Sequence, residues 1–248
     1  TNGTLSGDGS NLFHSFRGFN LDTGQIANFL STSEIQNILA RVNGGNTSAI
    51  NGLLQVTGGS SNLYLINPQG ILFGPDARLN LLGDFTAATA TSIGFDNGWF
   101  NFFEESDYSN LLGMPHSFTF DGAQIGSLLN SGQLAVSEGH SLTLLGGTVG
   151  NTGTLTAPGG TVTIAAIPTT DSNSDSTVRI SQANDVLSLD IDVNNFSPQS
   201  IFSTQTLPEL LTGGTPQFAE SIEANDVGQV VLSTSNTKIP ENPGTAIK

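Results

Sequence analysis

Leu129-Asn130-Ser131-Gly132-Gln133-Leu134-Ala135 is followed, 21 residues further along, by the similar segment Gly150-Asn151-Thr152-Gly153-Thr154-Leu155-Thr156. Both copies join a turn made of Asn and Gly to a short run in which apolar and polar side chains alternate. Each copy then continues through glycine into a second alternating run, at 142–144 and at 162–164. Turn, short strand, turn, short strand at a period of 20 to 21 residues predicts one coil of a β-solenoid.

One such coil is too small to bury its inward side chains by itself. Coils therefore stack, about 4.8 Å apart, and share one elongated core. Asn suits the corners because it tolerates the left-handed backbone conformation. The open ends of the stack need a cover, since unpaired strand edges invite aggregation. A β-sandwich, whose short strands recur about every 8–12 residues, is the alternative, and the repeat favours the solenoid.

The composition of the 248-residue chain excludes several classes of protein. Lys plus Arg number 6 against 21 Asp plus Glu, so the formal net charge is −15. So acidic a chain with scattered cations offers no binding surface for nucleic acid. The helix formers Lys, Glu, Arg and Met are scarce, and charged residues make up only 11% of the chain. We therefore expect an all-β protein and exclude a helical bundle.

Cysteine is absent from the chain. Its absence rules out disulfides, thiolate zinc sites and thiol catalysis, and it allows an exported chain to pass unfolded through a narrow pore. No run approaches the roughly 18 apolar residues of a transmembrane helix. Together with the Gly- and Asn-rich composition, these features predict an extracytoplasmic β protein.

Two segments interrupt the strand pattern. Residues 33–42 place Ile35, Ile38, Leu39 and Val42 at helical spacing behind a serine cap, which predicts a helix, with a strand imposed by tertiary context as the alternative. Residues 96–121 are rich in Trp, Phe and Tyr, and we expect this insertion to pack on the flank of the solenoid.

We expect a single domain over residues 1–248, the amino-terminal piece of something longer. Solenoid coils are expected from about 122 to 235, with an exposed loop over 169–177 and a linker-like end over 236–248.

The sharpest local motif is Asn67-Pro68-Gln69-Gly70-Ile71. Asn, Pro and Gly at the first, second and fourth positions are typical of a type I turn, and two apolar runs flank it. Pro68 presets the backbone angle, and the Asn67 side chain can accept a hydrogen bond from a downstream amide. As structure alone, the motif is one well-made corner of a solenoid.

Several motifs in a fixed order resemble those of a known family. They are Leu12-Phe13-His14-Ser15-Phe16, Phe19-Asn20, Arg41-Val42-Asn43-Gly44-Gly45, Ser48-Ala49-Ile50-Asn51-Gly52 and the Asn67–Ile71 motif. Together they look like the haemagglutination-activity domain, the amino-terminal secretion domain of two-partner secretion exoproteins of the filamentous-haemagglutinin-like kind. The strong match covers residues 3–95, and a looser one to about 167 resembles cyanobacterial members.

The resemblance implies a right-handed parallel β-helix with an amino-terminal cap and extra-helical β elements. It implies recognition by the POTRA domains of a partner outer-membrane β-barrel transporter, and a solenoid that nucleates folding on export. The product would be a monomer, secreted or held at the cell surface after passing through the periplasm and outer membrane, and adhesins are common in such families.

The resemblance also assigns residues. Asn67, Pro68, Gln69, Gly70 and Ile71 map to a segment important for secretion. We expect Gly44, Gly45, Asn51 and Gly52 to form structural turns. The best-known members carry a second motif, Asn-Pro-Asn-Leu, where this chain has Gly24-Gln25-Ile26-Ala27-Asn28-Phe29.

Catalytic, metal and cofactor sites find little support in the residues. The histidines, at 14, 116 and 140, lack metal-ligand spacing, and we expect His14 to be a structural histidine with its hydrogen bonds satisfied. Asp190 and Asp192 share one strand face without aromatic or basic neighbours. The alternatives are an adhesin or carbohydrate-binding domain that uses Trp99 and the neighbouring Phe residues as a stacking platform, or a carbohydrate-active enzyme. We predict that the chain is not an enzyme.

Overall fold

The computed structural model describes residues 3–102, 106–121 and 125–167, together with strands at 177–183, 186–191, 222–224, 230–232, 237–238 and 246–247. Within these residues the helical content is one short 3-10 helix, η1 (Tyr108–Asn110). No helix in the described part of the chain is both long enough and apolar enough to span a membrane. The all-β prediction is confirmed.

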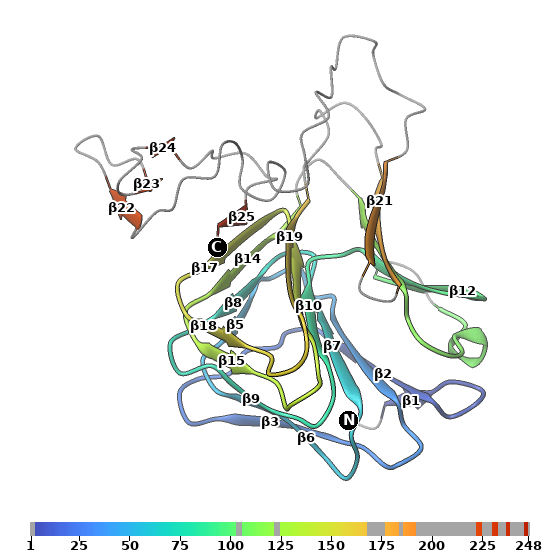
Figure 1. The fold of residues 1–248 in the computed structure, drawn as a ribbon. Coiled ribbons are helices and arrows are strands. Elements are labelled where there is room, and N and C mark those ends of the chain that lie inside the picture. The colour runs from blue at the N-terminus through green and yellow to red at the C-terminus, as the bar shows by residue number, and fades with distance from the viewer. Residues whose placement is uncertain are drawn as a thin grey trace, which may run out of the picture.

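Parallel strands stack into three sheets that wind around one axis in about six turns (Figure 1). The first sheet holds β2 (Asn11–Phe16), β4 (Asn37–Val42), β7 (Asn62–Ile66), β10 (Phe85–Ala88), β16 (Leu142–Gly146) and β19 (Val162–Ala166). The second holds β5 (Ser48–Ile50), β8 (Ile71–Phe73), β14 (Ser127–Asn130), β17 (Thr148–Asn151) and β25 (Ala246–Ile247). The third holds β3 (Ile26–Leu30), β6 (Leu53–Thr57), β9 (Arg78–Asn80), β15 (Gln133–Ala135) and β18 (Thr154–Thr156). The predicted β-solenoid is confirmed.

The coils differ in length along the stack. In the carboxy-terminal coils, Leu128 pairs with Val149 and Gln133 with Thr154, which is the predicted 21-residue step. In the first coils, Asn11 pairs with Asn37, 26 residues later. The repeat is therefore visible in the sequence only where the corners are shortest.

The central strands of the first sheet, β4, β7, β10 and β16, are buried on both faces. Its inward side chains fill the solenoid core, which includes Ile38, Leu63, Phe85 and Leu142. Its outward side chains fill a second apolar core that includes Phe13, Leu39, Tyr64, Ile93, Phe100, Phe118 and Phe120. Two cores share one sheet, so its strands lack the simple alternation of apolar and polar residues.

This double burial explains why the helix expected over residues 33–42 is wrong. The segment ends in strand β4, in which every residue is buried. Ile38, Ala40 and Val42 belong to the solenoid core, whereas Leu39 belongs to the second core. Apolar residues on both faces of a strand imitate the spacing of an amphipathic helix.

The second core is closed by an antiparallel sheet outside the solenoid. The chain leaves the solenoid after β10 and forms β11 (Ser92–Phe95), β12 (Gly98–Asn101) and β13 (Ser117–Asp121) before it returns at β14. This excursion begins earlier and ends later than the insertion expected over 96–121. In Figure 1, β12 and β21 stand beside the stacked coils.

Two later strands correct the prediction of coils from 122 to 235. β20 (Thr177–Ala183) and β21 (Val186–Ile191) pair antiparallel and extend the sheet of β13, so they are not coils. A separate antiparallel sheet contains β22 (Ile222–Ala224), β23 (Val230–Leu232) and β24 (Thr237–Lys238). The expected loop at 169–177 lies outside the described residues except for Thr177, and most of the expected linker does too.

Arg41 fastens the extra-helical sheet to the solenoid. From the outward face of β4 its guanidinium donates to Ser15 Oγ (2.7 Å), to the Asn101 carbonyl and to Tyr108 Oη (3.1 Å). The same group lies 4.8 Å from the centre of the Phe100 ring, within the range of a cation–π contact. A charged side chain can be buried here because its donors are satisfied.

The amino-terminal end of the stack carries a partial cap. β1 (Thr4–Leu5) pairs antiparallel with β2 and covers the free edge of the first sheet. On the second sheet, Leu21 makes an isolated parallel bridge to Ile50. The predicted amino-terminal cap is confirmed.

An asparagine ladder runs along one corner of the stack. Asn62 Nδ2 donates to Asn37 Oδ1 (3.0 Å), Asn37 Nδ2 donates to Asn11 Oδ1 (2.8 Å), and Asn11 Nδ2 donates to the Leu111 carbonyl (2.8 Å). The next coil joins the ladder through the amide of Asp84, which donates to Asn62 Oδ1 (2.9 Å). Asn11 and Asn37 are fully buried, so each coil satisfies polar groups of its neighbour.

We predict that Asn37→Ala lowers the free energy of unfolding by about 2–4 kcal/mol, because it leaves the buried Asn11 Oδ1 without this partner and removes the acceptor of Asn62 Nδ2. Asn80→Ala is the matched control, since Asn80 is exposed and its side chain makes one coil-to-coil bond, to Gln55 Oε1 (3.0 Å). Its cost should stay within about 0.5 kcal/mol. Guanidinium unfolding measures both, and equal costs would contradict a structural role for the ladder.

Candidate functional site

The Asn67–Ile71 motif forms the corner between β7 and β8. The Gly70 amide donates to the Asn67 carbonyl (3.0 Å), which closes the turn. The Gln69 amide donates to Asn67 Oδ1 (3.0 Å), as expected for an Asn that caps its own turn. The Asn67 amide donates to the Ala88 carbonyl of the next coil (3.0 Å), so the turn is held on both sides.

The side chain of Asn67 also ties this corner to the preceding coil. Its Nδ2 donates to the Asn46 carbonyl (2.9 Å) and to Ser48 Oγ (3.0 Å). Asn67 itself has 0% of its surface exposed, so these bonds are made away from water. Both Oδ1 and Nδ2 of Asn67 thus have hydrogen-bond partners within the protein.

Little of the motif is visible from outside. Asn67, Pro68, Gly70 and Ile71 are buried, and Gln69 is exposed. Gly70 has φ of +118°, and a Cβ at this position would lie 2.9 Å from the Ser127 carbonyl oxygen of the next coil, so a side chain is excluded twice over. In the folded domain the motif is a buried joint between coils.

The predicted turn residues occupy two different corners. Gly44 and Gly45 lie in the loop whose Asn46 carbonyl binds Asn67, so the structure brings this loop and the motif together. A Cβ at Gly44 would overlap the Arg17 carbonyl of the coil before it. Asn51 and Gly52 lie at the next corner, where Asn51 Nδ2 donates to Thr23 Oγ1 (2.7 Å).

The structure does not bring the candidate catalytic groups together. His116 lies 3.4 Å from Asp96, and His140 lies 3.2 Å from Asp84, each as a separate surface pair. Asp190 pairs in register with Arg179 on β20, and Asp192 lies outside the described residues. Within the part of the chain that the structure describes, no three His, Asp or Glu side chains are placed to hold a metal ion.

The proposed stacking platform is largely interior. Phe100, Phe102, Phe118 and Phe120 are buried, and Trp99 is only partly exposed. Phe100, Phe118 and Phe120 pack in the second core and Phe102 is buried as well, so these four rings do not present the flat aromatic surface that a sugar ring would need.

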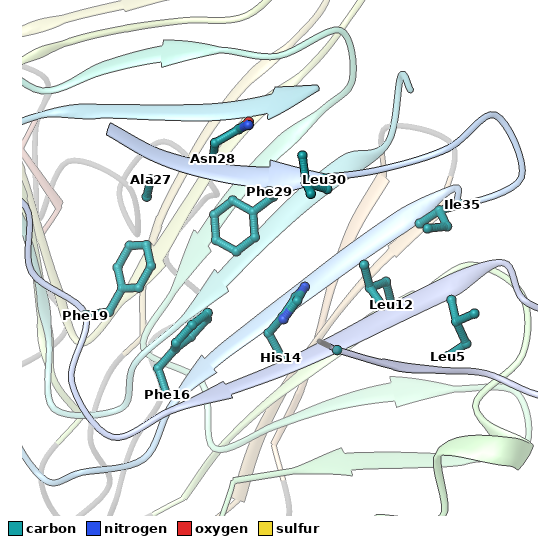
Figure 2. A pocket seen from close by; sticks show the side chains of 11 residues that line it. Leu5, Leu12, His14, Phe16, Phe19, Ala27, Asn28, Phe29, Leu30 and Ile35 are labelled. Atoms are coloured by element: carbon teal, nitrogen blue, oxygen red, sulfur yellow. The ribbon is translucent and has the colours of Figure 1, made fainter. Parts of the chain in front are cut away.

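A groove at the amino-terminal end of the solenoid was not anticipated from the sequence. It has a volume of about 540 Å³ and lies between β2 and β3. Figure 2 shows its lining side chains, which are mostly apolar: Leu5, Leu12, His14, Phe16, Phe19, Ala27, Asn28, Phe29, Leu30 and Ile35. The groove is the uncovered end of the core itself. The strand period of two places His14 on the inward face with Leu12 and Phe16, but it does not indicate that this face is left uncovered.

His14 differs from the expectation of a satisfied structural histidine. Its Nε2 is buried and has no hydrogen-bond partner, so that expectation is wrong. In register, His14 stands over Ala40, a position that the following coils fill with apolar residues. Burial lowers the pKa of His14, because it disfavours the charged ring.

We predict that Asn67→Ala destabilises the domain by about 2–4 kcal/mol, because the Gln69 amide and Ser48 hydroxyl each lose this partner and a void forms at a buried position. Gln69→Ala, at the exposed residue of the same motif, should cost less than about 0.5 kcal/mol. Thermal and denaturant unfolding measure the difference, and a similar cost for both would argue against a buried joint.

We predict that stability falls as the pH is lowered through about 6.5. The folded-state pKa of His14 lies below its unfolded value, so the unfolded chain takes up the proton first and acid favours unfolding. His14→Leu should reduce the part of this loss seen between about pH 7.5 and pH 5. An unchanged pH profile in the variant would contradict the assignment.

Comparison with solved structures finds a protein of similar fold. The crystal structure of the HMW1 secretion domain from Haemophilus influenzae matches with a TM-score of 0.50 and 24% sequence identity, over 77% of this chain and 47% of that chain. The chain thus spans about half the length of that structure, which it resembles in fold. No curated protein sequence matches the chain.

A family model supplies the stronger result. The model of the TPS secretion domain matches residues 1–211. That family consists of secretion domains of exoproteins and is not a known family of enzymes. Whether the chain is of the cyanobacterial type stays a prediction. The chain belongs to the TPS secretion domain family, the amino-terminal domains of two-partner secretion exoproteins.

Proposed function

We propose that this domain is the export signal of a larger exoprotein, read by the POTRA domains of a partner outer-membrane β-barrel transporter while the chain is still extended. Recognition before folding is supported by the burial of four motif residues in the folded domain: Asn67, Pro68, Gly70 and Ile71. A transporter that reads this motif by its side chains must meet it before the coils close over it. The route then runs through the periplasm and the outer membrane.

After passage, the domain folds and provides the first coils on which the rest of the exoprotein stacks. The parallel pairing of each coil with the next supports this order, because a solenoid can grow from one end. The absence of cysteine supports passage of an extended chain, since no disulfide has to be reduced. An adhesive role would belong to the other regions of the exoprotein.

Export of residues 1–248 behind a signal peptide tests the proposal, with and without the candidate transporter. We expect release into the medium that depends on the transporter. Asn67→Ala and Pro68→Ala should lower this release, because they change the motif that is read.

Ser48→Ala separates recognition from folding. Ser48 accepts a hydrogen bond from Asn67 Nδ2, so its loss weakens the same corner while residues 67–71 stay intact. Release should fall more for Asn67→Ala than for Ser48→Ala once the two are compared at matched stability. Release that follows stability alone would assign the motif to folding, and release without the transporter would overturn the proposal.

A further inference from the structure

Met114 supplies the asparagine ladder with a sulfur acceptor. It lies in loop 111–116, which joins η1 to β13. The side-chain amide of Asn37 has two hydrogens to donate: one goes to Asn11 Oδ1 (2.8 Å), and the other goes to Met114 Sδ (3.5 Å). Asn37 is fully buried, so the sulfur serves as the second partner of an amide that bulk water does not reach.

The same loop connects three parts of the molecule. Asn11 Nδ2 donates to the carbonyls of Leu111 (2.8 Å) and Gly113 (3.0 Å), which holds the loop against the ladder. The Leu111 side chain is buried in the second core. The Gly7 amide, in the turn between β1 and β2, donates to the Ser109 carbonyl just before the loop (3.2 Å). A chemical change in this loop therefore acts where the ladder, the second core and the amino-terminal cap meet.

The Met114 side chain is also open to oxidants. The residue is 49% exposed, and a thioether is converted to a sulfoxide by hydrogen peroxide. A sulfur lone pair attacks one peroxide oxygen, the O–O bond breaks, and the proton of the attacked oxygen passes to the other oxygen, which leaves as water. Sulfur is oxidised by two electrons, and the peroxide is reduced by two. With one methionine and no cysteine in the 248 residues, no other sulfur of the chain competes.

The hydrogen bond to Asn37 makes the two faces of the sulfur unequal. A thioether sulfur has two lone pairs, and oxidation of one or the other gives the two sulfoxide epimers. The Asn37 amide lies against one lone pair, which leaves the other for the peroxide. The new S–O bond then points away from Asn37 and draws electron density from the sulfur. The sulfur becomes a poorer acceptor for the buried amide, so the oxidised loop is held less tightly.

We propose that Met114 is a modification site at which peroxides form one sulfoxide epimer in preference to the other, and that this sulfoxide loosens loop 111–116 from the asparagine ladder. The preference arises from the fold, because it depends on the bond between Asn37 Nδ2 and the sulfur. The modification is independent of the export role.

Hydrogen peroxide applied to the intact chain tests the preference. One sample is oxidised folded and one in guanidinium, and mass spectrometry measures the gain of one oxygen at Met114. The peptide that carries Met114 is then released with a protease and given separately to a methionine-S-sulfoxide reductase and a methionine-R-sulfoxide reductase, each of which repairs one epimer.

After oxidation of the folded chain, we expect the amounts repaired by the two reductases to differ by about three-fold or more. After oxidation in guanidinium the two amounts should be similar. Similar amounts from both samples, or no gain of oxygen at Met114 in the folded chain, would overturn the proposal.

Hydrogen exchange tests the loosening, with Met114→Leu as the control variant. Leucine is close to methionine in volume and cannot form a sulfoxide, so this variant should fold. In the oxidised parent we expect roughly five-fold faster exchange of the Gly7 amide and of the His116 amide, both of which are hydrogen-bonded next to the loop. The Ser131 amide, at the corner between β14 and β15, should exchange at its original rate.

Peroxide-treated Met114→Leu should exchange like the untreated variant, which accounts for oxidation of other side chains such as Trp99. An oxidised parent that keeps its original exchange rates would contradict the loosening. Faster exchange to the same extent in the treated variant would contradict it too, because the effect would then not come from the sulfur.

Discussion

The structure depends on parallel hydrogen bonding between one coil and the next. No coil encloses a core of its own, since each contributes one layer of side chains to a column shared by the whole stack. Register is therefore the central constraint, because a slip by one residue would turn every inward side chain outward. The asparagine ladder through Asn11, Asn37 and Asn62 reinforces that register, since its buried amides find partners only when the coils are aligned.

The same constraint explains how the corners are built. Successive coils pass so close to each other that a side chain at Gly44 or Gly70 would meet the backbone of its neighbour. At Asn67, by contrast, a side chain is needed. From inside a buried turn, its side chain bonds the preceding coil and its backbone amide bonds the next one. Such corners have little freedom to vary, and this makes them recognisable as motifs in the sequence.

Much of the architecture could be predicted from the sequence for this reason. The repeat around Asn130 and Asn151 revealed coils where the corners are short, and the Asn67 motif predicted a turn. The strand β4 was mistaken for a helix because burial on both faces is a property of the assembled molecule. The groove could not be predicted either, since the first coil resembles the others in sequence pattern and nothing in that pattern shows that the described residues leave its outer side uncovered. The inward orientation of His14 follows from the alternation of side chains along a strand. Its Nε2 lacks a hydrogen-bond partner because the amino-terminal cap supplies none at this position, which the sequence does not reveal.

The position of the extra-helical sheet has a consequence for the order of events when the chain appears residue by residue. β10 and β14 belong to one turn of the solenoid, yet the three strands of the excursion separate them. That turn cannot close until about forty further residues are available, so closure involves contacts distant in sequence and is slow. Phe13 and Leu39 lie in the core that this excursion covers, and β20 joins it only after β19. A newly emerged chain therefore passes through a stage with three finished turns and one bare apolar flank, when unwanted association is most dangerous.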